Sequence, residues 1–310
     1  MRDSTMRILI AGASGFIGRE LVKTLVNNHQ IIVLGRDIKL LDKAFPKIVE
    51  KLTWDNLDSF DARNLDIIIN VAGSNIGAKR WTVAVKKELI ESRTLTNKRL
   101  IDCLIKQNAH PHYYCANAIG IYGAFDNNKT SFDENYPVSA NKTNDFLKQI
   151  GLTWQESLIP AIDHGIKVTT LRFGVVLKKG EGMLKKLELP FYLGLGSILG
   201  TGNQMISWIH YQDLVDAVMF LIDHPEITGP VNITSPNPIS QKELADQLAR
   251  ALKRPLILKI PTFMVKALFG EMGEYLLLKG QKVVPAKLVN HGFEFTYPDL
   301  ASALKHEYSA

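Results

Sequence analysis

The sequence predicts an α/β protein with a doubly wound parallel sheet, Rossmann-like in pattern, and a smaller C-terminal substrate lobe. Three observations predict this fold: short continuous apolar runs, helical apolar spacing between the runs, and a glycine-rich turn after the first run. Strands that are covered by helices on both faces are apolar along their whole length, as these runs are. Repeated strand–helix units of this kind build right-handed crossovers in a parallel sheet.

The first unit is a strand, a turn, a helix and a second strand within about thirty residues. Residues 8–11 (Ile-Leu-Ile-Ala) and 31–34 (Ile-Ile-Val-Leu) are the two predicted strands. The apolar positions of the helix between them recur with helical spacing: Ile17, Leu21, Val22, Leu25 and Val26.

Later segments continue the alternation. Strands are predicted at residues 66–71, 112–116, 167–172 and 231–234, and a helix at 213–222. A long helix is predicted to open at Trp81-Thr82, with Thr82 as N-cap and with Leu89, Leu95 and Leu100 among its apolar positions. Ser240-Gln241-Lys242-Glu243 is typical of a capping box and opens a helix through Leu252.

The change of rhythm after Arg172 predicts two lobes. Residues 1–172 and 211–234 form the dinucleotide-binding domain in this interpretation. Residues 173–210 and 235–310 form the smaller lobe, which closes over the carboxyl edge of the sheet.

Composition limits the partners. The chain has 310 residues, 46% of them hydrophobic, and a net charge of +6 from Lys and Arg residues that are spread along it. Without a basic cluster no nucleic-acid partner is expected, whereas an anionic small molecule suits this charge. Two cysteines form no disulfide framework or metal motif, and no apolar run has the length of a signal-peptide core or a membrane span. We therefore expect a cytoplasmic protein with no membrane partner, and leave its oligomeric state open.

The turn after the first strand predicts a dinucleotide site. In Gly12-Ala13-Ser14-Gly15-Phe16-Ile17-Gly18, the first glycine allows a tight turn, the second a close approach of the pyrophosphate, and the third close packing of helix on strand. Phosphates then lie at the helix N-terminus, where free amides and the dipole favour negative charge. A turn that serves packing alone is the alternative. The predicted cofactor contacts here are Gly12, Ser14, Gly15, Phe16, Ile17 and Gly18.

The end of the second strand selects the nucleotide. A guanidinium at this position grips a 2′-phosphate, whereas a carboxylate holds a ribose 2′-hydroxyl. Arg36 therefore favours NADP(H) over NAD(H), although Asp37 could still reach the hydroxyl and Arg36 could be a surface charge. Val71, Ala72 and Gly73 end another strand with small residues, so we expect the ribose or nicotinamide to lie against them.

Together these features resemble the extended short-chain dehydrogenase/reductase superfamily, and within it a branch labelled epimerase family protein with a C-terminal domain of unknown function. The resemblance runs from Met6 to about Leu304. The segments that carry it are Lys79-Arg80-Trp81-Thr82, Ser92-Arg93, Tyr122-Gly123, Gly202-Asn203-Gln204, Ser207-Trp208-Ile209-His210, Gly270-Glu271-Met272-Gly273, Gly280-Gln281, Pro285 and Gly292-Phe293.

The catalytic residues of the superfamily do not carry over. Its members use a Tyr, a Lys four residues later and a nearby Ser or Thr, and the ammonium lowers the pKa of the phenol. The resemblance places Leu147 and Gly151 at the Tyr and Lys positions, and residues 116–120 replace the Ser-rich stretch. The catalytic residues therefore stay unassigned. Asn117 and Tyr122 are weak candidates, with core packing as the alternative for Tyr122.

Several polar and aromatic residues are predicted to line a substrate cleft between the lobes: Arg80, Trp81, Gln204, Trp208 and His210. An Arg beside a Trp suits an anionic or planar ligand group. Packing between the lobes is the alternative for Trp208 and His210. No metal is expected, because His210 has no second His or Cys at ligand spacing.

Two functions follow. The first is an NADP(H)-dependent oxidoreductase with an epimerase-like fold, acting on an unidentified small carbonyl or hydroxyl substrate. Nucleotide-sugar-like compounds are one candidate class of substrate. The second is a non-catalytic NADP(H) sensor or partner-binding protein, because the Ser, Tyr and Lys set is missing.

Overall fold

The computed structural model describes residues 5–45, 47, 50–126, 130–139 and 144–309. Its main body is one seven-stranded sheet in the order β12-β7-β5-β4-β1-β2-β3, in which every neighbouring pair is parallel. The strands are β1 (Arg7–Ala11), β2 (Gln30–Gly35), β3 (Glu50–Thr53), β4 (Ile67–Asn70), β5 (His112–Ala118), β7 (Val168–Phe173) and β12 (Gly229–Ile233). The predicted doubly wound α/β fold is confirmed.

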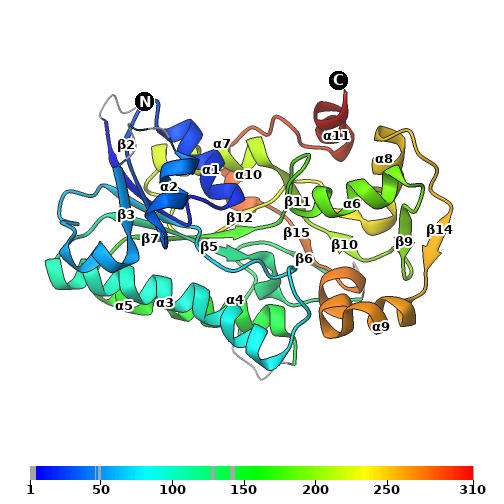
Figure 1. Cartoon of the computed structure of the whole chain (residues 1–310), viewed down its shortest axis with the longest axis horizontal. Helices are drawn as coiled ribbons and strands as arrows, with labels where there is room; N and C mark the ends of the chain where they lie inside the picture. Colours follow the sequence, from blue (N-terminus) through cyan, green and yellow to red (C-terminus); the bar gives the residue numbers. More distant parts are fainter. Residues whose placement is uncertain (1–4, 46, 48–49, 127–129, 140–143, 310) are drawn as a thin grey trace.

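Helices cover both faces of this sheet (Figure 1). One layer contains α1 (Phe16–Leu25) and α7 (Tyr211–Asp223), which contact each other. The opposite layer contains α3 (Val83–Gln107), α4 (Phe146–Glu156) and α5 (Ile159–Asp163). This double cover is the reason that β1 and β4 are buried along their length.

The remaining elements are short. Near the main sheet they are α2 (Ile38–Ala44), η1 (Trp54–Ser59), η2 (Ile119–Tyr122), β6 (Ser131–Phe132), β15 (Lys282–Val283) and α10 (Ala286–Asn290). Elsewhere they are β8 (Val175–Leu177), α6 (Gly182–Tyr192), β9 (Ser197–Leu199), β10 (Met205–Ile206), β11 (Trp208–His210), β13 (Ile239–Ser240), α8 (Gln241–Ala251), β14 (Leu258–Ile260), α9 (Thr262–Gly273), the π-helix η3 (Glu274–Leu278) and α11 (Leu300–Tyr308).

The order of the strands creates a switch point beside β1. From β1 the chain moves outward to β2 and β3, and it then returns to the other side of β1 through β4 and β5. The connections that follow β1 and β4 therefore run in opposite directions from the carboxyl ends of these two strands. They leave a crevice between them, which is where α/β sheets bind ligands. Ala11 pairs with both Leu34 and Asn70, so all three of these strands end at one level.

The predicted helix starts are confirmed. Thr82 caps α3, and its hydroxyl accepts a hydrogen bond from the Val85 amide at 3.2 Å. Ser240 caps α8 in the same way, with a bond of 3.1 Å from the Glu243 amide. The sequence interpretation missed β3, η1 and α2, which carry few buried residues, and Leu95 of α3 is 52% exposed rather than part of the core.

A second, smaller core lies beside the two-stranded sheets of the C-terminal part. It is formed by α6, α8 and α11 around the fully buried Trp208. Leu288 of α10 belongs instead to the large core of the main sheet. The two cores give the molecule two unequal parts joined side by side (Figure 1).

A buried histidine couples the main sheet to pH. His112 begins β5, and its Nε2 lies 2.8 Å from Thr169 Oγ1 while its ring stacks on Tyr114. Desolvation by burial, together with the charge of Lys167, lowers the pKa of His112 to about 4. An unfolded histidine has a pKa of about 6.5, so between these values only the unfolded chain binds the proton.

We therefore expect the free energy of unfolding to fall as pH drops from about 6.5 to 4, and His112 to contribute about 2 to 3 kcal/mol of this fall by pH 4.5. Urea unfolding at pH 7 and at pH 4.5 measures the effect. In His112→Gln, which keeps a polar partner for Thr169 but does not titrate, the fall should be smaller by that amount. An equal fall in variant and wild type would contradict the assignment.

Candidate functional site

The glycine turn at the end of β1 passes unusually close to its neighbours. Gly12 has φ +79°, and a Cβ on it would lie 2.6 Å from the Ala72 amide nitrogen. A Cβ on Gly18 would lie 2.3 Å from Gly12 O, which is backbone and cannot move aside. Both positions therefore require glycine. Gly12 needs it for the positive φ and for the close approach of Ala72, and Gly18 needs it for the packing of α1 on the turn.

The N-terminus of α1 presents free amides. Its N-cap is Gly15, which has no side chain to bond them, and Ser14 and Gly15 are exposed. Arg19 Nη1 donates to Ser14 O at 2.9 Å and fixes the turn. A concave turn with uncapped amides at the switch point of the sheet fits a dinucleotide pyrophosphate.

At the end of β2 the two candidate residues differ in what they already bind. Arg36 is exposed beside the turn. The Asp37 carboxylate caps α2 and accepts a hydrogen bond from the Lys39 amide at 2.8 Å. Asp37 is thus engaged in helix capping, which leaves the guanidinium as the free group at this strand end.

The loop after β4 lies over a buried guanidinium. Arg93 of α3 donates to Ser74 O at 3.1 Å and to Leu89 O at 2.8 Å, and a Cβ on Gly73 would lie 3.2 Å from Arg93 Cζ. Burial lowers the pKa of Arg93 to about 10, so it stays charged at neutral pH. The sequence interpretation quoted Arg93 only as part of the resemblance. It missed that this charge lies beneath Gly73, because the contact joins two separate elements.

In Asn117, the first catalytic candidate, both the nitrogen and the oxygen of the side-chain amide make hydrogen bonds within the protein. Its Nδ2 donates to Gly151 O at 3.0 Å, and its Oδ1 accepts from the Ala118 amide at 2.7 Å. These bonds tie the end of β5 to α4. They account for Asn117 as a structural residue.

The second weak candidate, Tyr122, is also buried. Its Oη accepts from Arg172 Nη1 at 2.8 Å and lies within hydrogen-bond distance of Asp133 O and Asn232 Oδ1. Burial raises the pKa of Tyr122. Its ring stacks on Phe132 in a local core, in agreement with the packing alternative.

The helix α4 is packed too tightly on η2 for a side chain at position 151. A Cβ on Gly151 would lie 2.8 Å from the Cβ of Ile121, and a Cβ on Gly120 would lie 3.1 Å from the Cβ of Leu147. A lysine at position 151 would collide with η2. The absence of the lysine is therefore matched by the packing around Gly151.

The predicted cleft residues in the second part of the chain are buried. Trp208 is fully buried and its indole donates to Asn237 O at 3.0 Å. Gln204 Nε2 donates to Leu199 O at 3.1 Å and to Leu277 O at 2.7 Å. The placement of Trp208 agrees with the packing alternative, and the bonds of Gln204 are likewise made within the fold.

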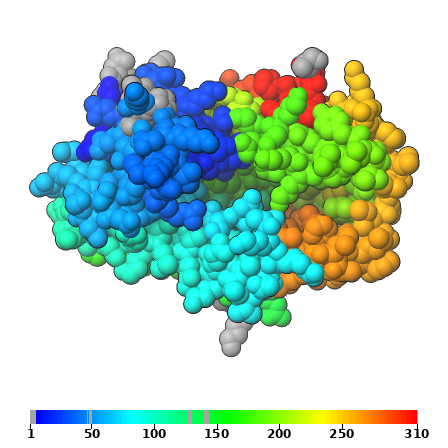
Figure 2. Space-filling view, viewed as in Figure 1, coloured from blue at the N-terminus to red at the C-terminus, as the bar shows by residue number. Residues whose placement is uncertain are grey.

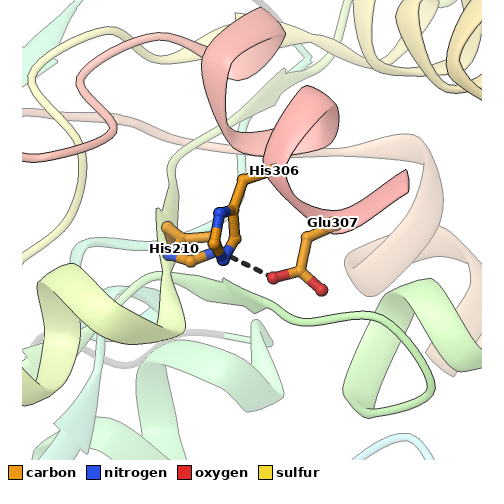
Figure 3. Close-up of side chains that lie close together, drawn as sticks. All are labelled: His210, His306 and Glu307. Carbon is orange, nitrogen blue, oxygen red and sulfur yellow. Dashed lines mark hydrogen bonds and ion pairs between the residues drawn. The ribbon is translucent and has the colours of Figure 1, made fainter. Parts of the chain in front are cut away.

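His210 joins the C-terminal helix to the core (Figure 3). Its Nε2 lies 2.8 Å from Glu307 Oε1, and its Nδ1 accepts from the Gln212 amide. His306 lies on the same helix, and the potential ligand atoms of these two histidines and Glu307 all fall within 4.8 Å. Both nitrogens of His210 are used in protein bonds. The cluster is thus explained as the anchor of α11, and we assign no metal to it.

Arg80 and Trp81 lie on the loop between β4 and α3. The Trp81 indole donates to Ile76 O at 2.9 Å, and its ring meets Phe146 edge-on at 4.9 Å. Arg80 is exposed, and a Cβ on Gly270 of α9 would lie 3.0 Å from its Nη2. The side chain of Arg80 therefore reaches from the loop after β4 to α9.

A hollow lies among these segments. Figure 2 shows it between the blue N-terminal part, the green segment that contains α6, and the cyan segment that leads into α3, with orange α9 at one end. Lys186 of α6 reaches across to Gly77 O, at 2.6 Å. The hollow is therefore bordered by the N-terminal part of the chain, the segment that leads into α3 and the C-terminal part.

The fold and this site define a nicotinamide-dinucleotide-binding protein of the extended short-chain dehydrogenase/reductase type. A model of the NAD-dependent epimerase/dehydratase family matches residues 8–234, and one of a domain of unknown function (DUF1731) matches residues 260–307. The chain belongs to the NAD-dependent epimerase/dehydratase family. Among the described residues, no helix is both long and apolar enough to span a membrane.

Relatives match along nearly the whole chain. The chloroplastic epimerase family protein SDR39U1 homolog of Arabidopsis thaliana is 34% identical, over 98% of this chain and 87% of that protein. Epimerase family protein YfhF of Bacillus subtilis is 32% identical, over 96% and 97%. The crystal structure of human epimerase family protein SDR39U1 (isoform 2) with NADPH superposes with a TM-score of 0.87 at 28% identity, over 98% of this chain and 99% of that one. The predicted family is thereby confirmed.

Proposed function

We propose that this protein binds NADP(H) and is an oxidoreductase for a small carbonyl or hydroxyl compound. The observation that carries the proposal is the uncapped glycine turn at the switch point, with Arg36 free beside it and Asp37 engaged as a helix cap. The NADPH in the crystal structure of the human relative supports the choice of nucleotide.

The chain's own residues have separate roles in this proposal. The amides at the start of α1 hold the pyrophosphate, and Arg36 holds the 2′-phosphate. Val71, Ala72 and Gly73 leave room for the ribose and nicotinamide at the end of β4, where the buried charge of Arg93 adds a positive field. The nicotinamide, when bound, supplies or accepts the hydride. The substrate then occupies the hollow beside Gly73, and nucleotide-sugar-like compounds are one class to test.

A second function is favoured by the bonds of Asn117 and Tyr122. Since both candidates are engaged within the fold and α4 carries neither Tyr nor Lys at the superfamily positions, the protein could bind NADP(H) without turnover and act as a sensor. NADPH oxidation with a panel of carbonyl compounds decides between the two. Tight NADPH binding with no oxidation by any compound, together with a partner that co-purifies, would favour the sensor.

Arg36→Ala tests the nucleotide choice. Charge-assisted bonds to a phosphate contribute about 1.5 to 3 kcal/mol each, so NADPH affinity should fall about 10- to 100-fold while NADH affinity changes less than about 3-fold. Calorimetry with both nucleotides measures this. A matched control is Lys39→Ala, which removes an exposed charge from the same segment. Equal losses for NADPH and NADH in Arg36→Ala would refute the assignment.

A further inference from the structure

The π-helix η3 and the residue that follows it place a tyrosine, Tyr275, and a lysine, Lys279, near the helix that lacks them. Tyr275 and Leu276 pack against the cluster that contains Trp81, Phe146 and Leu147. The family resemblance places Leu147 at the position where the superfamily has its tyrosine. The C-terminal part of the chain therefore places a tyrosine against the cluster that contains the N-terminal end of α4. It belongs to the orange segment that lies at one end of the hollow in Figure 2.

Contacts on three sides hold η3 in this place. Gln204 Nε2 donates to Leu277 O at 2.7 Å. Gly280 and Phe125 exchange both of their backbone hydrogen bonds at 3.0 Å. A Cβ on Gly280 would overlap Met205 O, so the chain can pass here only as glycine. A single π-turn held this firmly is an unusual feature, and such turns are frequent at functional sites.

Tyr275 of η3 and Lys279, the residue directly after η3, form a pair. Lys279 Nζ lies 4.7 Å from the centroid of the Tyr275 ring and 3.0 Å from Glu274 Oε1. Among the described residues the Tyr275 hydroxyl makes no hydrogen bond, unlike that of Tyr122. The other charges that act on the pair are carboxylates: Glu271 from α9, Asp145 from the start of α4, and Asp126.

We infer that Tyr275 and Lys279 supply the proton transfer for which α4 carries no side chains. This inference rests on the proposed oxidoreductase function. Tyr275 is the catalytic residue in it, and Lys279 is a positioning residue that acts on the phenol.

The step balances in the direction of reduction. As the hydride reaches the carbonyl carbon, the Tyr275 O–H bond breaks and its proton forms the new O–H bond on the carbonyl oxygen. The ammonium of Lys279 stabilises the phenolate, which then recovers a proton from water. NADPH is oxidised and the carbonyl is reduced by two electrons, so no further co-reactant is needed.

The charge states suit this direction. Desolvation raises the pKa of Tyr275, against the lowering effect of Lys279, so the phenol holds its proton at neutral pH and can donate it. Desolvation lowers the pKa of Lys279, but the hydrogen bond and charge of Glu274 raise it by more, so the net shift of this pKa is upward. A protonated phenol thus faces a permanent ammonium.

Tyr275→Phe and Lys279→Met test the pair in the full-length protein. Tyr192→Phe is the matched control, because Tyr192 is exposed on α6. Lys266→Met is the control for the lysine, because Lys266 pairs with the same carboxylate, Glu274, at 3.1 Å. Three measurements are made on each: NADPH affinity by fluorescence, NADPH oxidation with 9,10-phenanthrenequinone as the carbonyl probe, and the pKa of Tyr275 by NMR of ¹³Cζ-labelled tyrosine.

We expect NADPH affinity to be unchanged in all four variants. Oxidation should fall about 100-fold or more in Tyr275→Phe and about 10-fold or more in Lys279→Met, through kcat rather than KM, and stay unchanged in the controls. Lys279→Met should raise the pKa of Tyr275 by about one unit. NADPH should shift the Tyr275 resonance in the wild type.

Wild-type rates in Tyr275→Phe would overturn the inference while leaving the proposed function intact. If the wild type does not reduce the quinone probe, the NMR signal of Tyr275 provides the test. A Tyr275 signal that does not shift when NADPH is added would then overturn the inference. Absence of NADPH binding to the wild type would overturn the proposed function together with this inference.

Discussion

Replacing Gly18 with alanine is expected to remove tight NADPH binding. The new Cβ would lie 2.3 Å from Gly12 O and 2.6 Å from Ala13 Cα, and both are backbone atoms of the turn. The helix α1 must then move away from the turn, which takes its N-terminal amides out of line with the pyrophosphate. Because overpacking costs about 1 to 3 kcal/mol, NADPH affinity should fall about 10- to 100-fold by calorimetry.

Gly165→Ala is the control for this substitution. Gly165 has a positive φ, +73°, which Gly18 does not, and nothing lies within 4 Å of the added Cβ. It should therefore lower the free energy of unfolding by about 1 kcal/mol and leave NADPH affinity unchanged. An unaltered affinity in folded Gly18→Ala would mean that the turn is not the pyrophosphate site.

The strands of the main sheet could be predicted because their burial on both faces imposes a local signature. Residues 8–11 and 31–34 are apolar without interruption, and both lie in the sheet as expected. The edge strand β3 has no such signature, because its residues (Glu50–Thr53) are only partly buried. Sequence reasoning thus found the strands that form the core and missed one at the edge.

The cofactor turn could be predicted for the same reason, since its glycine spacing is local. The hollow beside it could not, because its walls come from segments far apart in the chain. The sequence pattern places Gln204, Trp208 and His210 in a substrate cleft, with packing between the lobes as the alternative for Trp208 and His210. Their bonds to Leu277, Asn237 and Glu307 are visible only in three dimensions. The resemblance already shows that α4 lacks the Tyr and Lys, whereas the packing of Tyr275 against the cluster that contains Leu147 depends on the tertiary fold.

The largest effect on stability is expected at Trp208. This side chain is fully buried in the second core, whose members include Leu177, Leu184 and Leu244, and its indole N–H donates a hydrogen bond to Asn237 O. Truncation of a buried tryptophan costs the transfer free energy of the ring and leaves a cavity. Trp208→Ala should therefore lower the free energy of unfolding by about 3 to 5 kcal/mol, measured by urea denaturation.

Trp208→Phe separates the ring from its hydrogen bond. Phenylalanine keeps most of the apolar volume but leaves the Asn237 carbonyl without its donor, so we expect a smaller loss of about 1 to 3 kcal/mol. In both variants the folded protein should retain wild-type NADPH affinity, because the turn and Arg36 lie on the main sheet. A tryptophan that contacted a ligand in the hollow would give the reverse result, with little loss of stability and a clear loss of binding or turnover.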